Sequence, residues 1–331
     1  MRTDLLALLI CPTCENGRLE LVVTARDTRE VRTGFVFCYH CQSTYPVADG
    51  IVDLLGDPPA SIEQEQRGWL KLLGETTPEL DAHMLQLPDL PDPHWLSQAT
   101  NFHALLSHVK LAGARVLDIG SGRTWSARWL LRYGAGQVVA IDILREKYIG
   151  LATAELFFQA DDIYFERILC DMEHLPFAAE TFDAVLSTAS LHHALDLGRV
   201  FNALSRILRP GGLALIVNEP VRRCGTEQDL SNSPEVAVGI NEHTYTILEW
   251  LAAATKAGLR PQLHVPQSVK LAQQEGRLGE VLVSPRVNYL AQLLGSSVGK
   301  RLLNWQSLLV KTYCDYELPL AMVARKLDTA Y

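Results

Sequence analysis

Short apolar runs alternate with amphipathic stretches through the middle of the chain. Each run is rich in aliphatic residues, and the segments between the runs carry apolar residues at helical spacing. The runs that we interpret as strands are Arg115–Ile119, Gln137–Ile141, Phe165–Cys170, Ala184–Ser187 and Leu213–Val217. This alternation predicts an α/β fold, a doubly wound sheet that is mostly parallel, with helices on both faces. Such sheets bind ligands at the carboxyl ends of their strands.

The pattern continues towards the C-terminus. Leu259–Val265 predicts another strand, and Leu318–Arg325 predicts a closing strand that is antiparallel to its neighbours. Thr246 and Glu249 are spaced as a capping box and predict the start of the helix between them and Gly258.

Before the first strand of this pattern the sequence predicts helices that cover the sheet. Ser61 and Gln64 have the spacing of a capping box, so a helix is expected to begin at Ser61 and run to about Leu73. A second helix is expected to begin near His94, after a proline-rich segment.

Residues from about 266 to 317 form an insertion before the closing strand. Its apolar residues recur at helical spacing, at Val287, Leu290, Ala291, Leu294, Val298, Leu302, Trp305 and Leu309. We expect a helical element that either shapes acceptor specificity or forms a homodimer contact, and the sequence leaves both alternatives open.

Two CxxC pairs lie near the N-terminus, Cys11 with Cys14 and Cys38 with Cys41. This arrangement is typical of a tetrahedral zinc ribbon, although a redox dithiol pair and disulfides are alternatives. Four thiolates would fill the coordination sphere, so we expect a structural rather than a catalytic Zn²⁺. Gly17 would let the chain turn after the first pair.

The composition is that of a globular protein, with 331 residues, 48% hydrophobic residues and a net charge of −8. The negative charge argues against binding nucleic acid by bulk electrostatics. No apolar run reaches the roughly 18 residues of a membrane span, so no span is expected. We therefore predict a cytoplasmic protein with reduced thiols, in which Cys170, Cys224 and Cys314 are isolated.

The segment Val116–Trp125, VLDIGSGRTW, predicts a strand, a glycine turn and the start of a helix. The glycines and the helix N-terminus suit a ligand that is approached by backbone N–H groups. Asp142 ends the next strand, where an acidic residue can bind a ribose diol. The third glycine of the dinucleotide fingerprint is absent, and Arg123 and Thr124 stand where that motif continues.

Further motifs follow in order, namely Asp171 after a strand, FDAVLSTASLHH, and LSRILRPGGLALIVNEP. Together they resemble the class I, type 11-like methyltransferases that use S-adenosylmethionine. The resemblance covers Gly113–Leu259 and Leu318–Lys326, and it implies a seven-stranded Rossmann-like core with an antiparallel closing strand. YPVADGIVDLL near the N-terminus resembles the small zinc-binding proteins that activate methyltransferases. The expected domains are a zinc ribbon at 1–57, a linker with helices that cover the cofactor at 58–112, and a methyltransferase domain at 113–331.

The resemblance implies roles for individual residues of the cofactor site. In order along the cofactor, Asp118, Gly120, Ser121 and Gly122 would border the methionine moiety, Asp142 the ribose, Ile143, Asp171 and Met172 the adenine, and Ser187 the sulfonium. For each aspartate a helix cap or a surface salt bridge is the alternative.

Candidate acceptor residues follow the fourth and fifth strands. His192 or His193 could act as a base or orient the acceptor, unless the pair only starts a helix. Glu219 could bind a cationic or hydroxyl group of the acceptor. Trp69 and Trp95 would line the acceptor pocket or serve as packing anchors.

The function predicted from these features is methyl transfer from S-adenosylmethionine to oxygen, nitrogen or carbon of a small molecule, such as a natural product, sugar or lipid intermediate. One alternative is an RNA methyltransferase that recognises its substrate through the zinc ribbon. The alternative from another class is a non-catalytic scaffold that binds the cofactor or a partner protein.

Overall fold

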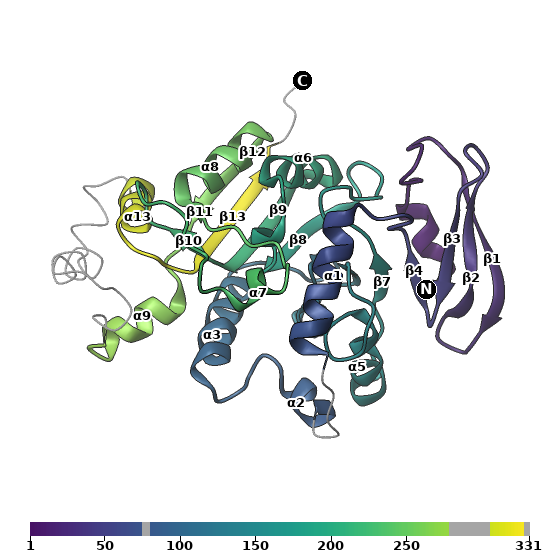
Figure 1. Cartoon of the computed structure of the whole chain (residues 1–331), viewed down its shortest axis with the longest axis horizontal. Coiled ribbons are helices and arrows are strands. Elements are labelled where there is room, and N and C mark those ends of the chain that lie inside the picture. Colours follow the sequence, from purple (N-terminus) through teal and green to yellow (C-terminus); the bar gives the residue numbers. More distant parts are fainter. Residues whose placement is uncertain (75–79, 278–304, 328–331) are drawn as a thin grey trace.

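The computed structural model describes residues 1–74, 80–277 and 305–327, and its centre is a large mixed sheet with helices on both faces (Figure 1). The sheet has eleven strands in the order β1-β2-β3-β4-β7-β6-β5-β8-β9-β13-β12. Its strands are β1 (Leu19–Arg26), β2 (Val31–Cys38), β3 (Thr44–Ala48), β4 (Ile51–Asp53), β5 (Arg115–Ile119), β6 (Gln137–Asp142), β7 (Glu166–Leu169), β8 (Phe182–Thr188), β9 (Leu208–Glu219), β12 (Leu259–Leu263) and β13 (Leu320–Lys326). A second, two-stranded sheet pairs β10 (Val221–Arg222) with β11 (Tyr245–Thr246).

The helices of the described residues flank this sheet. They are α1 (Ala60–Leu73), α2 (Leu80–Gln86), α3 (Pro93–Ser107), α4 (Trp125–Arg132), α5 (Ala154–Asp161), α6 (Leu197–Ile207), α7 (Pro234–Ala237), α8 (Ile247–Lys256), α9 (Gln267–Gln274) and α13 (Trp305–Asp315). Three short 3₁₀ helices are η1 (Thr3–Leu8), η2 (Leu151–Thr153) and η3 (Leu191–His193).

The predicted α/β fold is confirmed, because the five expected central strands all form. They pair in parallel in the order β7-β6-β5-β8-β9, so the winding reverses between β5 and β8. The closing strand β13 lies antiparallel between β9 and β12, as expected. β9 begins earlier than predicted, at Leu208 instead of Leu213, so Arg209–Gly212 lie within this strand. The pairing of β8 with β9 shifts register between Phe182 and Ala184, and this irregularity accommodates Arg209–Gly212.

The N-terminal strands extend the same sheet. β4 pairs in parallel with β7, through Val52 with Ile168 and Asp53 with Leu169, and thereby joins β1–β3 to the core. The N-terminal segment therefore shares its sheet with the predicted methyltransferase domain instead of forming a sheet of its own.

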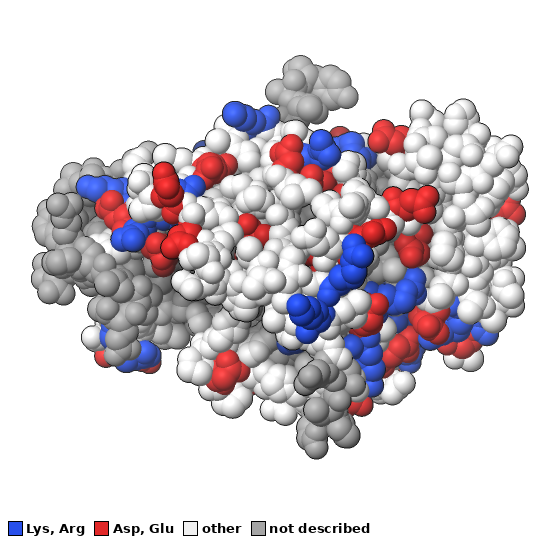
Figure 2. All heavy atoms as spheres, in the orientation of Figure 1, with Lys and Arg blue, Asp and Glu red and all other residues white. Residues whose placement is uncertain are grey.

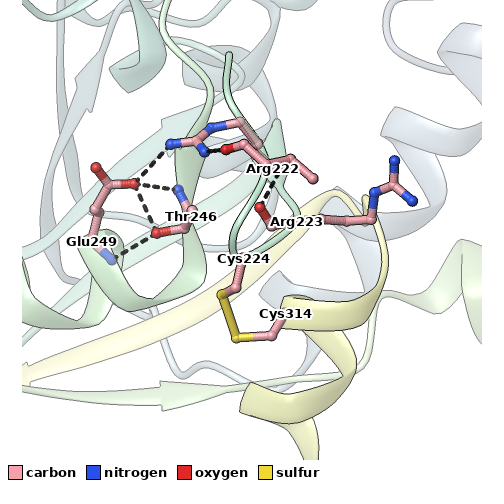
Figure 3. The surroundings of a disulfide bond; sticks show 7 residues. Arg222, Arg223, Cys224, Thr246, Glu249 and Cys314 are labelled. Atoms are coloured by element: carbon pink, nitrogen blue, oxygen red, sulfur yellow. Dashed lines mark hydrogen bonds and ion pairs between the residues drawn. A yellow bond between two sulfur atoms is a disulfide. The ribbon is translucent and has the colours of Figure 1, made fainter.

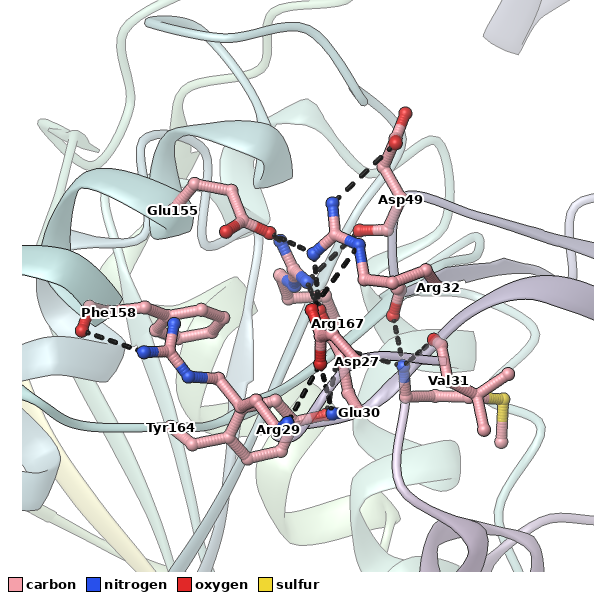
Figure 4. Close-up of polar contacts among 12 residues, drawn as sticks. Asp27, Arg29, Glu30, Val31, Arg32, Asp49, Glu155, Phe158, Tyr164 and Arg167 are labelled. Atoms are coloured by element: carbon pink, nitrogen blue, oxygen red, sulfur yellow. Dashed lines mark hydrogen bonds and ion pairs between the residues drawn. The ribbon is translucent and has the colours of Figure 1, made fainter. Parts of the chain in front are cut away.

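A buried polar cluster fastens this junction (Figure 4). The Arg167 guanidinium on β7 donates to Glu30 just before β2, with a distance of 2.6 Å to Oε1, and both side chains are fully buried. Arg167 also donates to Glu155 at 3.0 Å, and Arg32 bonds both carboxylates. The ion pairs thus connect the β1–β2 segment, β7 and α5.

The two predicted capping boxes differ in outcome. At α8 the Thr246 hydroxyl accepts from the Glu249 N–H, and the Glu249 carboxylate accepts from the Thr246 N–H, so this prediction is confirmed. At α1 the prediction is wrong, because the helix begins at Ala60 after Pro59 and has no side-chain cap. Proline at that point already provides a conformation from which a helix can start.

Cys224 and Cys314 form a disulfide, so the prediction that they are isolated thiols is wrong (Figure 3). They are 90 residues apart in sequence, and only the packing of α13 beside the segment after β10 brings them together. The insertion is described only at its ends, by α9 and α13. Its predicted helical positions at 287–302 lie outside the described residues.

We find among the described helices none whose length and apolar character would allow it to cross a membrane.

Candidate active site

A cavity of about 480 Å³ opens at the carboxyl ends of β5, β6 and β8. This volume lies within the range of small-molecule and cofactor sites. Its walls come from α1, α3, the glycine turn and the loops after β6, β7 and β8. The residues from the sequence prediction that line it are Gly120, Ser121, Gly122, Asp142, Ile143, Asp171, Met172, His193, Trp69 and Trp95.

The glycine turn forms the floor of the cavity. Gly120 has a φ of +60°, and a Cβ there would lie 2.4 Å from the Cβ of Ser190. Glycine is therefore required at this position for both conformation and space. At Gly122, which also has a positive φ, the nearest atom to a Cβ would be 3.8 Å away. That side of the turn is open to a ligand.

Thr124, which stands where a third glycine is missing, adopts a backbone conformation that glycine usually provides. It precedes α4 with a φ of 59°, in the left-handed region, and its hydroxyl is buried without a hydrogen-bond partner among the described residues. A β-branched residue is strained in this conformation. The backbone thus keeps a glycine-like turn although the sequence carries threonine.

Asp118 lies beneath the turn and does not line the cavity. Its Oδ2 accepts from the Ser121 and Ser126 hydroxyls at 2.5 and 2.6 Å, and its Oδ1 has no partner among the described residues. Burial raises the pKa of Asp118 to about 7. The residue therefore holds the turn and the start of α4 together from below.

Asp142 faces the cavity at the end of β6. Its Oδ2 accepts from the Gly122 N–H at 2.7 Å, and its Oδ1 accepts from the Leu144 N–H at 2.8 Å. Each carboxylate oxygen has a second lone pair, so the group can still accept two hydrogen bonds from a vicinal diol. Burial raises the pKa of Asp142 to about 6.

Asp171 lines the cavity after β7, beside Met172 and opposite Ile143. Its Oδ1 accepts from the Glu173 N–H at 2.9 Å, and its Oδ2 lies 2.6 Å from His174 Nδ1. These contacts hold the carboxylate at the rim, next to apolar side chains that suit a flat ring.

Ser187, Glu219 and His192 do not line the cavity but form a buried network behind it. Glu219 is fully buried and accepts from the N–H groups of Ser190, Leu191 and His192 at 2.9, 3.0 and 3.2 Å. Its Oε2 lies 2.7 Å from His192 Nδ1, and the Ser187 hydroxyl donates to its Oε1 at 3.1 Å. Glu219 therefore positions the loop after β8 and does not reach an acceptor in the cavity, which corrects the expectation from the sequence.

The two histidines have opposite electrostatic environments. Burial alone would lower the pKa of His192, but the hydrogen bond and charge of Glu219 raise it overall. Burial and the neighbouring His192 lower the pKa of His193 to about 3. His193, the one of the pair that lines the cavity, is thus a neutral imidazole near pH 7.

Sequence reasoning missed Glu65, which lines the cavity from α1. It lies between Ile62 and Trp69 on the face of α1 that covers the site, and burial raises its pKa to about 8. The sequence signal was a glutamate at helical spacing between the apolar residues Ile62 and Trp69. A glutamate exposed to solvent would be expected on the polar face of the helix.

The four N-terminal cysteines converge as the CxxC spacing predicts. Cys11 Sγ lies 3.5 Å from Cys41 Sγ, Cys14 Sγ lies 3.6 Å from Cys38 Sγ, and all four sulfur atoms lie within 4.8 Å of one another. Thiolates bound about 2.3 Å from one zinc ion at tetrahedral angles would be about 3.8 Å apart. A Cβ at Gly17 would lie 1.9 Å from Cys38 Sγ, so only glycine leaves room for this cluster.

Both cysteine pairs sit in matching turns. The Glu15 N–H donates to the Cys11 carbonyl at 2.8 Å, and the Gln42 N–H donates to the Cys38 carbonyl at 2.9 Å. The Tyr45 hydroxyl lies 3.2 Å from Cys11 Sγ and orients it. The donor set fits a closed tetrahedral ion with no free coordination position.

Residues 117–216 match the family model described as "Methyltransferase domain". The central part of this chain is therefore similar to methyltransferase domains. The matched segment includes the glycine turn, Asp142, Asp171 and His193, and it supplies most of the residues that line the cavity.

Similar proteins extend this finding. The chain is 34% identical over 158 residues to 27-O-demethylrifamycin SV methyltransferase of Amycolatopsis mediterranei (strain S699), covering 46% of this chain and 56% of that protein. It is 28% identical over 186 residues to phthiotriol/phenolphthiotriol dimycocerosates methyltransferase 1 of Mycobacterium ulcerans (strain Agy99), covering 52% of this chain and 65% of that protein. The chain thus spans less than two thirds of the length of these curated relatives.

One solved structure shows the same fold over most of the chain. Geranyl diphosphate C-methyltransferase from Streptomyces coelicolor A3(2), solved with S-adenosyl-L-homocysteine, aligns with a TM-score of 0.53 and 15% identity, covering 82% of this chain and 99% of that chain. At this identity the likeness establishes the fold alone.

Proposed function

We propose that the chain transfers a methyl group from S-adenosylmethionine to a largely apolar small molecule. The observation that supports this function best is the open glycine turn beside Asp142, at the edge of a 480 Å³ cavity. The matched methyltransferase domain and the natural-product and lipid methyltransferases among its relatives support the same activity.

In the proposed complex the residues act mainly by positioning. Asp142 would accept hydrogen bonds from the ribose, Ile143 and Met172 would contact the adenine, Asp171 would accept from its amino group, and the Gly120–Gly122 turn would border the methionine moiety. S-adenosylmethionine supplies an electrophilic methyl group on a sulfonium, so the protein has only to align the acceptor and exclude water.

The acceptor side of the cavity is apolar and aromatic. Ile62 and Trp69 from α1 and Trp95 from α3 line the cavity, and Trp69 contacts His193 edge-on with ring centroids 5.5 Å apart. These walls favour an apolar body, while the neutral imidazole of His193 can accept a hydrogen bond from the group that is methylated. We therefore favour a natural product or lipid intermediate as the acceptor.

We assign the four cysteines to a structural Zn²⁺ held by Cys11, Cys14, Cys38 and Cys41. The ion would crosslink the turn after η1 to the end of β2 and would leave no coordination position for substrate. Charges of both signs are mixed on the visible face of the molecule, and its N-terminal part is largely uncharged there (Figure 2). This face offers no continuous basic patch for an RNA.

Calorimetric titration with S-adenosylhomocysteine tests the cofactor assignment. Asp142→Asn should weaken binding about 10- to 100-fold, because a hydrogen bond to a charged group contributes about 1.5–3 kcal/mol. Asp89→Asn, on a residue outside the cavity that pairs with His103, should bind like the unmodified protein. Equal affinity in the unmodified protein and Asp142→Asn would remove the ribose assignment.

Labelled S-adenosylmethionine tests the acceptor class. The purified protein is incubated with lipid and small-molecule extracts and, separately, with total RNA with and without nuclease. We expect label in the organic extract. Label that is released by nuclease would replace this acceptor with RNA.

A further inference from the structure

Three carboxylates and two imidazoles meet at the wall of the cavity, which Glu65 and His193 line. His192 and His193 come from η3 after β8, Glu242 from the loop before β11, Glu65 from α1 and Glu219 from the end of β9. His192 Nε2 lies 3.7 Å from Glu242 Oε2, and His193 Nδ1 lies 3.6 Å from Glu242 Oε1. Glu65 Oε1 lies 3.9 Å from the same His193 nitrogen.

These separations are too long for hydrogen bonds but suit ligands of one ion. Ligand atoms about 2.1 Å from a shared metal at tetrahedral or slightly wider angles are about 3.4–3.7 Å apart. The donor atoms of His192, His193 and Glu242 all lie within 4.8 Å of one another. Only small side-chain movements would bring the three onto one ion.

The orientation of His192 also suits a ligand. Its Nδ1 lies 2.7 Å from Glu219, whose carboxylate is held by three backbone N–H groups and therefore accepts the Nδ1 hydrogen. In a neutral imidazole the lone pair is then on Nε2, the atom that faces Glu242. A carboxylate behind a histidine is the usual outer partner of a metal ligand.

Three carboxylates of low exposure gather in this cluster, and ionising all three would leave excess negative charge there. Side-chain exposure is 12% for Glu65, 13% for Glu242 and 0% for Glu219, yet their ion-pair partners within the described ranges are His192 and His193, with no lysine or arginine. Buried carboxylates require a compensating charge. A divalent cation would provide it at the point where the side chains converge.

We propose that His192, His193 and Glu242 bind a divalent transition-metal ion, with Glu65 as a further ligand and Glu219 as the outer partner of His192. Two imidazoles with carboxylate favour Zn²⁺, Fe²⁺ or Co²⁺ over Mg²⁺ and Ca²⁺, which prefer oxygen ligands. Binding would replace the contact of His193 Nδ1 with the Asn241 carbonyl, now 2.7 Å, and would require the neutral tautomer whose hydrogen is on Nε2.

The site has a consequence for the acceptor that rests on the proposed function. Glu65 and His193 line the cavity, so the ion would be reached from it, and expansion to five-coordination would admit an oxygen of the acceptor. A hydroxyl, enol or carboxylate acceptor would then be favoured over an amine.

Cobalt titration of the whole chain, after bound metal ions have been removed, tests this site separately from the cysteine site. Thiolate ligation produces intense near-ultraviolet charge-transfer bands, whereas histidine and carboxylate ligands produce only weak visible bands. We expect two equivalents of Co²⁺ per chain, one with each spectrum, and the same two equivalents when Zn²⁺ is measured by metal analysis.

Glu242→Gln should lower the affinity for the second Co²⁺ ion at least about 10-fold and leave the thiolate bands unchanged. Glu65→Gln serves as a second variant should the first fail to fold. His103→Asn is the matched control, because His103 pairs with Asp89 away from the cavity. This variant should still bind both equivalents of Co²⁺.

A single equivalent with thiolate bands would overturn the proposal, as would a second equivalent that Glu242→Gln and Glu65→Gln leave unchanged. Titration with S-adenosylhomocysteine on the same samples separates the two hypotheses. Normal cofactor binding without the second ion removes only the metal site, and a second ion without cofactor binding removes only the proposed function.

Discussion

The buried ion pair between Glu30 and Arg167 should determine how firmly the cysteine-bearing segment is joined to the core. We consider Arg167→Met, which keeps an unbranched apolar side chain and removes the charged guanidinium. Arg167 donates to Glu30 at 2.6 Å and to Glu155 at 3.0 Å, and the side chains of the Glu30 pair are both 0% exposed (Figure 4). The variant therefore leaves a buried carboxylate that has lost its nearest cation.

The magnitude follows from this geometry. Two charges about 4 Å apart attract by about 4 kcal/mol at an effective dielectric constant of about 20. Breaking a buried pair by removing one partner costs about 3–5 kcal/mol. Because Glu30 keeps Arg32 at 2.8 Å, we expect the lower end, a loss of about 3 kcal/mol in the free energy of unfolding. In a chain of this size that lowers Tm by about 4 °C.

The assay is urea unfolding followed by tryptophan fluorescence at a fixed zinc concentration. Glu30→Gln and the double variant complete a double-mutant cycle, in which we expect a coupling energy of about 2 kcal/mol. Arg223→Met is the control, because its pair with Glu317 is 50% and 63% exposed and should contribute less than about 1 kcal/mol. The reasoning would be refuted if Arg167→Met lost no more free energy of unfolding than the control variant. It would also be refuted if the effects of the two single variants simply added in the double variant.

Three further predictions concern individual residues. Thr124 has a φ of 59°, so Thr124→Gly should be about 1 kcal/mol more stable than Thr124→Ala in urea unfolding, and the reverse order would contradict the strain. Alkylation of denatured protein without reductant should leave Cys224 and Cys314 unmodified in mass spectrometry, and labelling of both would show that the disulfide is absent. The pKa of Asp142 is raised to about 6 by burial, so affinity for S-adenosylhomocysteine should be constant above pH 7 and fall as pH drops through 6, when the carboxylate is protonated. Calorimetry across this range checks it, and the Asp142→Asn variant should lack this fall.

Local patterns in the sequence determined the core of this fold. Arg115–Ile119 and its four companion runs are strands because aliphatic residues in short runs pair into a buried parallel sheet. The helix cap at Thr246 could be predicted from the sequence because its hydrogen bonds join residues that are three positions apart. The four cysteines converge because each pair is held by its own short turn.

Contacts between distant segments were decided only by the tertiary structure. The pairing of β4 with β7 makes the N-terminal strands part of the central sheet, and hydrophobic periodicity does not specify which edge a strand will join. The Cys224–Cys314 disulfide likewise depends on where α13 lies.

The same division holds within the candidate site. Asp142 and the glycine turn could be predicted because a strand and the turn after it are neighbours in sequence. The burial of Glu219 behind His192, and the approach of Glu65 and Glu242 to the histidines, could not, since four separate elements converge there. Local propensity specifies which elements form, but the low-dielectric neighbourhood of a side chain exists only after those elements have packed together.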